Sequence, residues 1–252
     1  MKHLFEPVTT ERILGVRVAP FSYESLLQEL QLAIAERRQG WIVAINPEKI
    51  VQARTQPALR ELLNQAEFPI ADGVGVVLAS RLLGGQVRQR ITGIETMLQI
   101  CERAAREGWR LFLLGGKPGV AQSASQVLLR RFPGICIAGT HDGYFQEDEA
   151  VIRQINESAA DVLFVGMGSP RQEAWIRDNR HRLSPRILQG VGGSYDVICG
   201  NIPRAPDWMQ RLGLEWLFRL IREPKRWRRQ LLLPQFLWMV LREWGQRRSE
   251  RR

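Results

Sequence analysis

The side chain best suited to acid–base chemistry in this chain is Asp72, which follows an apolar segment. Residues 68–71 read as a buried strand, and Gly73-Val74-Gly75 comes directly after the aspartate. A carboxylate at that position would project from a strand end into a crevice, where a general base has to stand. The alternative is an aspartate that only caps a helix or closes a turn. We interpret Asp72 as the candidate catalytic base.

A second strand end carries a glycine turn that suits phosphate. Residues 161–165 are apolar, and Gly-Met-Gly-Ser-Pro-Arg-Gln-Glu follows at 166–173. The pattern predicts a helix with Ser169 as its N-cap and Pro170 in its first turn. Backbone N–H groups and the positive helix end would then face the sheet edge. A tight connection without a ligand fits too, but the polar residues after Pro170 favour a ligand.

Further strand ends add candidates and exclusions. Asn46, the pair Gly115-Gly116 and residues 190–193 also follow apolar runs, and Asp196 comes soon after as a substrate-binding residue or a helix cap. The chain has no histidine pair at metal-ligand spacing and no Asp-x-Asp at a strand end, so we expect no metal and no other cofactor. Gly73-Val74-Gly75 lacks the third glycine of a dinucleotide fingerprint, which leaves a nucleotide-dependent oxidoreductase as a weaker alternative.

These candidates need strands that share one edge. The pattern predicts strands at 12–18, 41–45, 68–71, 110–114, 135–139, 161–165 and 187–190, alternating with helices such as 47–64. We therefore expect an α/β body with a Rossmann-like, mostly parallel sheet over residues 1–203. From 204 to 252 we expect a helical C-terminal appendage, broken at Pro224 and Pro234.

Composition indicates a globular protein in a reducing compartment. The 252 residues are 44% hydrophobic and 25% charged, and the three cysteines are scattered. The first twenty residues lack the apolar stretch of a signal peptide, so we expect a cytoplasmic protein. No apolar run reaches the roughly 20 residues that a membrane span requires.

The net charge of +10 is concentrated in the appendage. Residues 204–252 hold 13 basic and 5 acidic side chains and five of the eight tryptophans. Basic residues mixed with Trp and Leu suit an anionic lipid surface. A basic nucleic-acid-binding α/β protein is the rival interpretation, although it leaves the crevice unexplained.

Two arginine pairs stand in this appendage. Arg219 and Arg222 are three residues apart, as are Arg226 and Arg229, and each pair would share one helix face. Such pairs could clamp a diphosphate, although a solvated basic face is the simpler alternative.

Several motifs together point to one family. They are Asn46, Ala-Asp-Gly-Val-Gly at 71–75, Arg-Ile-Thr-Gly at 90–93, Leu-Leu-Gly-Gly at 113–116, residues 166–175, Gly-Val-Gly at 190–192, Asp196, Arg-Ala-Pro at 204–206 and Gly-Leu-Glu-Trp at 213–216. These motifs occur in the same order as in the WecG/TagA/CpsF group, glycosyltransferase family 26, which the chain resembles over residues 13–229. One departure is Ala44, where the family often has Thr, and this bears on which sugars are used.

The resemblance implies an inverting, metal-independent transferase. It would move N-acetylmannosamine or a related sugar from a UDP-sugar to undecaprenyl-diphosphate-linked N-acetylglucosamine, for cell-surface polysaccharide or teichoic-acid-type polymers. It would lie peripherally on the inner face of the plasma membrane, need no nucleic acid, and could form a homo-oligomer. Asp72 would be the base. The substrate-binding residues would be Asn46, Arg90, Gly115, Gly116, Gly168, Gln172 and Asp196, with Arg219, Arg226 and Arg229 completing the site.

Overall fold

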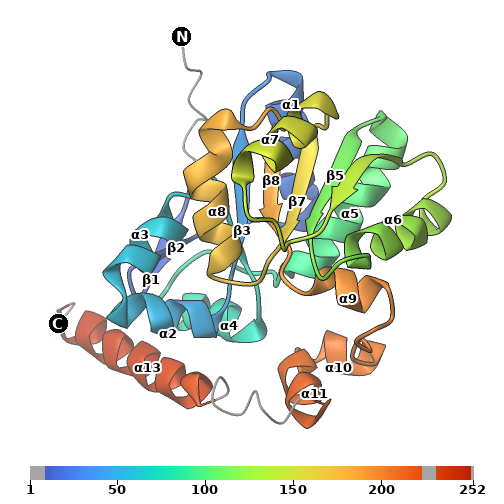
Figure 1. The fold of residues 1–252 in the computed structure, drawn as a ribbon. Coiled ribbons are helices and arrows are strands. Elements are labelled where there is room, and N and C mark those ends of the chain that lie inside the picture. The colour runs from blue at the N-terminus through green and yellow to red at the C-terminus, as the bar shows by residue number, and fades with distance from the viewer. Residues whose placement is uncertain (1–8, 223–230, 251–252) are drawn as a thin grey trace.

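A six-stranded parallel sheet forms the centre of the computed structural model, which describes residues 9–222 and 231–250 (Figure 1). The strand order is β4-β3-β8-β7-β5-β6. The strands are β3 (Gly40–Ile45), β4 (Phe68–Ala71), β5 (Arg110–Gly115), β6 (Cys136–His141), β7 (Val162–Gly166) and β8 (Ile187–Gly190). The predicted Rossmann-like α/β class is confirmed.

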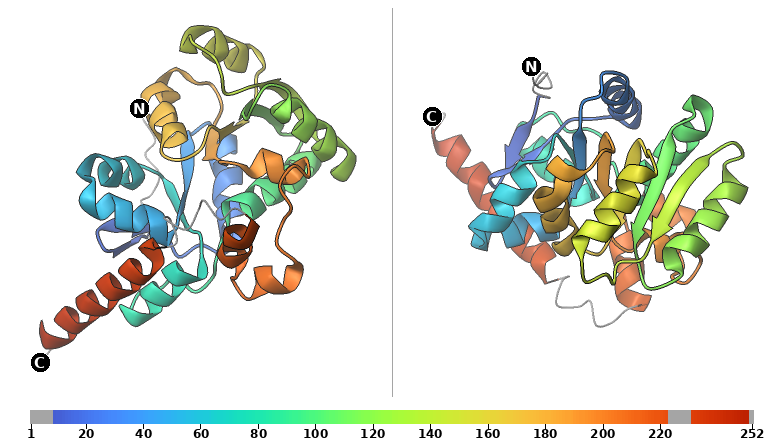
Figure 2. Two further views of the ribbon diagram at one scale, coloured as in Figure 1. Left: turned by 60° about the horizontal axis from the view of Figure 1, so that its bottom comes forward. Right: turned by 45° about the horizontal axis from the view of Figure 1, so that its top comes forward.

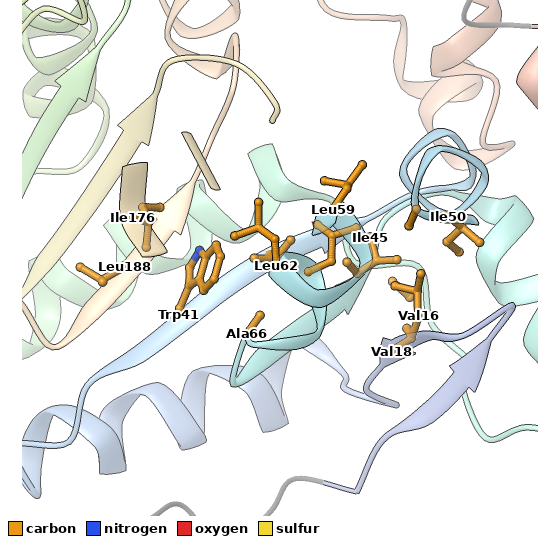
Figure 3. Close-up of a cluster of buried hydrophobic side chains, with 14 of the residues drawn as sticks. Val16, Val18, Trp41, Ile45, Ile50, Leu59, Leu62, Ala66, Ile176 and Leu188 are labelled. Atoms are coloured by element: carbon orange, nitrogen blue, oxygen red, sulfur yellow. The ribbon is translucent and has the colours of Figure 1, made fainter. Parts of the chain in front are cut away.

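Helices cover both faces of the sheet, since the strands inside the edge strand β6 are mainly apolar and buried on both sides. One face carries α1 (Tyr23–Ala35), α5 (Gly93–Glu107), α6 (Val120–Arg131) and α9 (Ser194–Ile198). The other carries α2 (Pro47–Thr55), α3 (Pro57–Asn64), α4 (Val74–Leu82), α7 (Asp148–Glu157) and α8 (Arg171–Asn179). In Figure 3 the fully buried Trp41 lies among Leu62, Ile176 and Leu188, which joins β3, α3, α8 and β8.

The strand order favours a ligand site at the carboxyl edge of the sheet. The connection from β3 runs outward to β4, and that from β5 runs outward to β6 on the opposite side. Connections that leave in opposite directions separate the loops at their strand ends, and ligands bind in the resulting crevice.

Three predicted elements were wrong in detail. The strand expected at 12–18 is an antiparallel hairpin of β1 (Glu11–Ile13) and β2 (Val16–Val18), outside the main sheet, because Leu14 and Gly15 turn the chain with positive φ. The helix expected over 47–64 ends at Thr55 and restarts at Pro57. Helix α8 begins at Arg171 with Pro170 as its N-cap, so Ser169 does not cap it.

The C-terminal part is helical, as predicted, with α10 (Asp207–Arg211), α11 (Glu215–Arg222) and α13 (Leu232–Glu250). The break expected at Pro234 is wrong, because this proline lies in the first turn of α13, where its missing N–H needs no helical acceptor. Pro224 lies outside the described residues. None of the helices within 9–222 and 231–250 is both long and apolar enough for a membrane span.

Helix α13 returns to the body and packs there. Its Phe236 and Val240 are buried in the same core cluster as side chains of α2 and α4. Nη1 of Arg247 donates to the carbonyl oxygen of Leu83 over 3.1 Å, at the end of α4. Figure 2 shows α13 beside α4, with α10 and α11 on the other side of α4.

Candidate active site at the carboxyl edge of the sheet

Asp72 and Asn46 lie side by side at the ends of two paired strands. Ile45 pairs with Ala71 in register, and the backbone N–H of Asp72 donates to the carbonyl oxygen of Ile45 over 2.8 Å. Asn46 is the N-cap of α2, and its Oδ1 accepts from the Lys49 N–H at 2.9 Å. Asp72 is half-buried and precedes Gly73, the N-cap of α4, so it is not the cap of that helix. The structure thus brings the expected base and an expected substrate-binding amide together.

Arg90 reaches this edge through a short backbone bridge. The N–H of Ile91 donates to the carbonyl oxygen of Ala71 over 2.8 Å, which holds Arg90 next to the strand end that carries Asp72. The guanidinium donates to the carbonyl oxygen of Gln210 at 2.8 Å and forms an ion pair with Glu215. The Arg90 backbone therefore lies beside Asp72, and its guanidinium ties the body to α10 and α11.

Tyr23 is a neighbour of Asp72 that sequence reasoning missed. Its hydroxyl oxygen accepts a 3.0 Å hydrogen bond from the N–H of Thr92, which is the N-cap of α5. Burial raises the pKa of Tyr23, and the negative charges of Glu95 and Asp72 raise it further. Asp72 and Glu95 are therefore close enough to Tyr23 to act on it electrostatically.

Gly115 and Gly116 at the end of β5 pack directly against the backbone of Gly166 at the end of β7. Gly115 has φ +122°, and a Cβ there would lie 2.4 Å from the carbonyl oxygen of Gly166. The N–H of Gly116 donates to that same oxygen over 2.8 Å. Because its donor is already paired, Gly116 would serve a ligand by close backbone approach and not by a hydrogen bond. Because of the close contact with Gly166, position 115 has no space for a side chain.

Gln172 is turned into the protein and not toward solvent. It is 3% exposed, and its Oε1 accepts from the N–H of Gly192 at 2.9 Å. Gly168 has φ +78° and open space where a Cβ would stand, and its carbonyl oxygen accepts from the Gln172 N–H at 2.9 Å. Gln172 therefore holds two glycine turns, after β7 and after β8, in fixed positions.

A buried ion pair lies beneath these turns. Nζ of Lys49 donates to Oε1 of Glu173 at 2.8 Å and to the carbonyl oxygen of Ala44 at 2.9 Å. Glu173 is 1% exposed, and its Oε2 has no hydrogen-bond partner among the described residues. Amide Nε2 of Gln172 also donates to Glu173 at 3.2 Å. The network connects the ends of β3 and β7, and sequence reasoning did not predict this pair.

The remaining predicted residues are more scattered. Asp196 lies inside α9, half-buried, and accepts from Nδ2 of Asn201 at 3.2 Å, so it is not the helix cap. Arg219 is in α11, whereas Arg226 and Arg229 lie outside the described residues. Arg204 forms a 2.9 Å ion pair with Glu95. The described part of the chain holds no group of three or more His, Cys, Asp or Glu side chains placed for a metal ion.

The fold and the strand-end side chains are those of an α/β enzyme with its candidate site at the carboxyl edge of a Rossmann-like sheet. A model of the glycosyl transferase WecG/TagA/CpsF family matches residues 11–250. The chain belongs to this family, as the resemblance predicted, and is a glycosyltransferase.

Two curated Bacillus proteins are similar over most of their length. Both are named N-acetylglucosaminyldiphosphoundecaprenol N-acetyl-beta-D-mannosaminyltransferase. The protein of Bacillus spizizenii strain W23 is 36% identical over 219 residues, which are 86% of this chain and 85% of the relative. The protein of Bacillus subtilis strain 168 is 35% identical over 235 residues, which are 93% of this chain and 92% of the relative. The nucleic-acid-binding and oxidoreductase alternatives find no support.

Proposed function

We propose that this chain transfers N-acetylmannosamine from a UDP-sugar to undecaprenyl-diphosphate-linked N-acetylglucosamine, with inversion. The names of the two Bacillus relatives support the transferred sugar and the acceptor. The single observation that carries the mechanism is the position of Asp72, beside Asn46 and the Arg90 segment at one strand edge.

The chemistry follows from this arrangement. The Asp72 carboxylate takes the proton from an acceptor hydroxyl as that oxygen bonds to the anomeric carbon of the donor sugar. The bond from that carbon to the UDP oxygen breaks on the opposite face, so the configuration inverts. The leaving diphosphate carries the electron pair and needs positive charge around it. Arg90 supplies one such charge, and we assign Arg219, Arg226 and Arg229 to the same task.

The acceptor is a lipid, which bears on where the enzyme acts. The appendage carries 13 basic and 5 acidic residues and five tryptophans, a composition suited to an anionic leaflet. We place the enzyme peripherally on the inner face of the plasma membrane, in the synthesis of a cell-surface polysaccharide or teichoic-acid-type polymer. The glycosyl transfer as proposed uses no metal ion or other cofactor.

A donor screen tests the proposal. A short-chain lipid-diphosphate N-acetylglucosamine serves as soluble acceptor, and release of UDP is measured with UDP-N-acetylmannosamine, UDP-N-acetylglucosamine and UDP-glucose. We expect turnover to be fastest with UDP-N-acetylmannosamine. Equal or faster turnover with another donor would overturn the assigned sugar, and acceptor-independent UDP release would overturn the transfer reaction.

A further inference from the structure

Helices α4 and α13 run side by side in the same direction. Near the start of both, a Cβ on Gly75 would lie 3.7 Å from the Phe236 ring. Near the end of both, Arg247 bonds the carbonyl oxygen of Leu83. Figure 2 shows the two helices adjacent on the outside of the molecule. The C-terminal helix therefore extends a surface that the body begins.

Each helix carries an exposed apolar stripe. On α4 it consists of Val74, Leu78 and Leu82, four residues apart, with Leu78 55% exposed. On α13 it consists of Leu237, Leu241 and Trp244, and Leu237 is 56% exposed. Residues at these spacings share one side of a helix.

The two stripes point to the same side of the helix pair. Val74 precedes the contact residue Gly75 by one position, whereas Leu237 follows the contact residue Phe236 by one. One position turns about 100° around a helix. The two helices are parallel and in contact. Moving one residue toward the N-terminus on the first helix and one residue toward the C-terminus on the second therefore rotates to the same side of the pair. The stripes therefore form one continuous apolar face.

Arginines accompany this face. The guanidinium carbon of Arg242 lies 5.6 Å from the Trp238 ring centroid, and that of Arg248 lies 5.4 Å from the Trp244 centroid. Helix α4 contains Arg81 and no acidic residue. On α13, Glu243 is paired with Arg247, which leaves Glu250 as its other acidic residue. Apolar side chains with arginines stacked on tryptophan suit the boundary between anionic headgroups and acyl chains.

We propose that α4 and α13 form one membrane-binding face, so that the catalytic body itself, and not only the C-terminal appendage, contacts the anionic leaflet. The choice of a bilayer as the occupant rests on the proposed function, whose acceptor is lipid-linked. A second copy of the chain fits less well, because a symmetric contact through this face would bring the arginines of the two copies together.

This face fixes the depth of the catalytic base. Asp72 stands two residues before Val74, so their Cα atoms are at most about 8 Å apart. With α4 at the acyl boundary, the carboxylate lies at headgroup level, where the diphosphate of a polyprenyl acceptor is anchored. Docking and acceptor positioning are then set by the same helix.

The full-length Leu78→Gln/Leu82→Gln variant tests the proposal by co-sedimentation with vesicles of phosphatidylcholine and phosphatidylglycerol. Removing two apolar side chains from the bilayer should weaken partitioning by about tenfold or more. The control is Leu32→Gln, since Leu32 is 49% exposed on α1, away from this face. Thermal unfolding of the variants should match that of the wild type, because these side chains are already exposed.

Turnover separates this proposal from the proposed function. The α4 variant should release UDP normally with the soluble acceptor and slowly with a full-length acceptor embedded in vesicles. If the wild type turned over neither acceptor, the proposed function would fail while the vesicle measurement still tested the face. Unchanged vesicle binding by the α4 variant would overturn the inference. So would a wild-type dimer that the variant converts to a monomer with vesicle binding intact.

Discussion

The guanidinium of Arg90 is paired with the carboxylate of Glu215, the first residue of α11. The two side chains are 21% and 17% exposed, so the pair is partly shielded from solvent. Arg90 also donates to the carbonyl oxygen of Gln210 at 2.8 Å. This side chain thus holds α10 and α11 against the body, and under the proposed mechanism the leaving diphosphate would share Arg90 with Glu215 or displace it.

Replacing Glu215 by Gln should loosen this attachment. Loss of the ion pair leaves the contact to the Gln210 carbonyl oxygen, so α10 and α11 should open more often, and their amide hydrogens should exchange faster. Hydrogen–deuterium exchange over residues 207–222 measures this. Glu102→Gln is the control, since Glu102 pairs with Arg106 on the exposed side of α5. Equal exchange in the Glu215 variant and the wild type would show that the pair does not hold the segment.

Asp72→Asn should lower turnover by roughly 10²–10⁴, the usual contribution of a general base. The amide is nearly isosteric with the carboxylate but cannot take the proton, so folding and UDP binding should be retained. UDP release with a soluble acceptor measures the turnover, and calorimetry measures the affinity for UDP. Asp178→Asn is a control, because Asp178 is exposed on α8. Near wild-type turnover in the Asp72 variant would contradict the assignment.

Activity should survive an excess of EDTA. The proposed mechanism neutralises the leaving diphosphate with arginine side chains and with the positive ends of helices, and these need no divalent ion. The measurement is UDP release before and after chelation, followed by addition of Mg²⁺ or Mn²⁺. Activity that disappears with EDTA and returns with either ion would rule out this form of the mechanism.

Breaking the buried pair of Lys49 and Glu173 should be costly. Replacing Glu173 by Gln leaves a buried ammonium group without its counter-charge, for which a loss of about 3–5 kcal/mol is typical. Urea unfolding gives the change in free energy. The exposed pair of Arg177 and Asp178 is the comparison, because removing such a pair costs about 1 kcal/mol or less. A similar small loss for both would mean that the buried pair does not stabilise the strand ends.

Local patterns predicted the elements well and the long-range contacts poorly. The strand that precedes Asp72 is visible in the sequence because apolar residues 68–71 stop at a glycine turn, and the structure confirms that Asp72 follows the carboxyl end of β4. Its role as the base stays a prediction. The pairing of Lys49 with Glu173 joins positions 124 residues apart, and no local signal connects them. The inward turn of Gln172 depends likewise on Gly192, which only the folded sheet brings near.

Errors in the predicted boundaries have local physical causes. Ser169 has the right type for an N-cap, but the helix begins only after Pro170. Pro234 was expected to break a helix, yet it lies in a first turn, where proline is tolerated. Residue type alone does not distinguish these positions, because the outcome depends on where the first helical hydrogen bond forms.

The close approach of Gly115 and Gly166 at the ends of β5 and β7 limits which residues can be varied at this strand edge. Any side chain at Gly115 would collide with the backbone of the neighbouring strand end, and one at Gly166 would collide with the ring of Tyr195. Substitutions at these positions would force the neighbouring backbone or the Tyr195 ring to shift. Ala44 at the end of β3 is a better target, because the family often has Thr there. A Cβ on the facing Gly93 would already lie 3.4 Å from the Ala44 Cβ, so a larger residue at 44 requires that position 93 stays glycine.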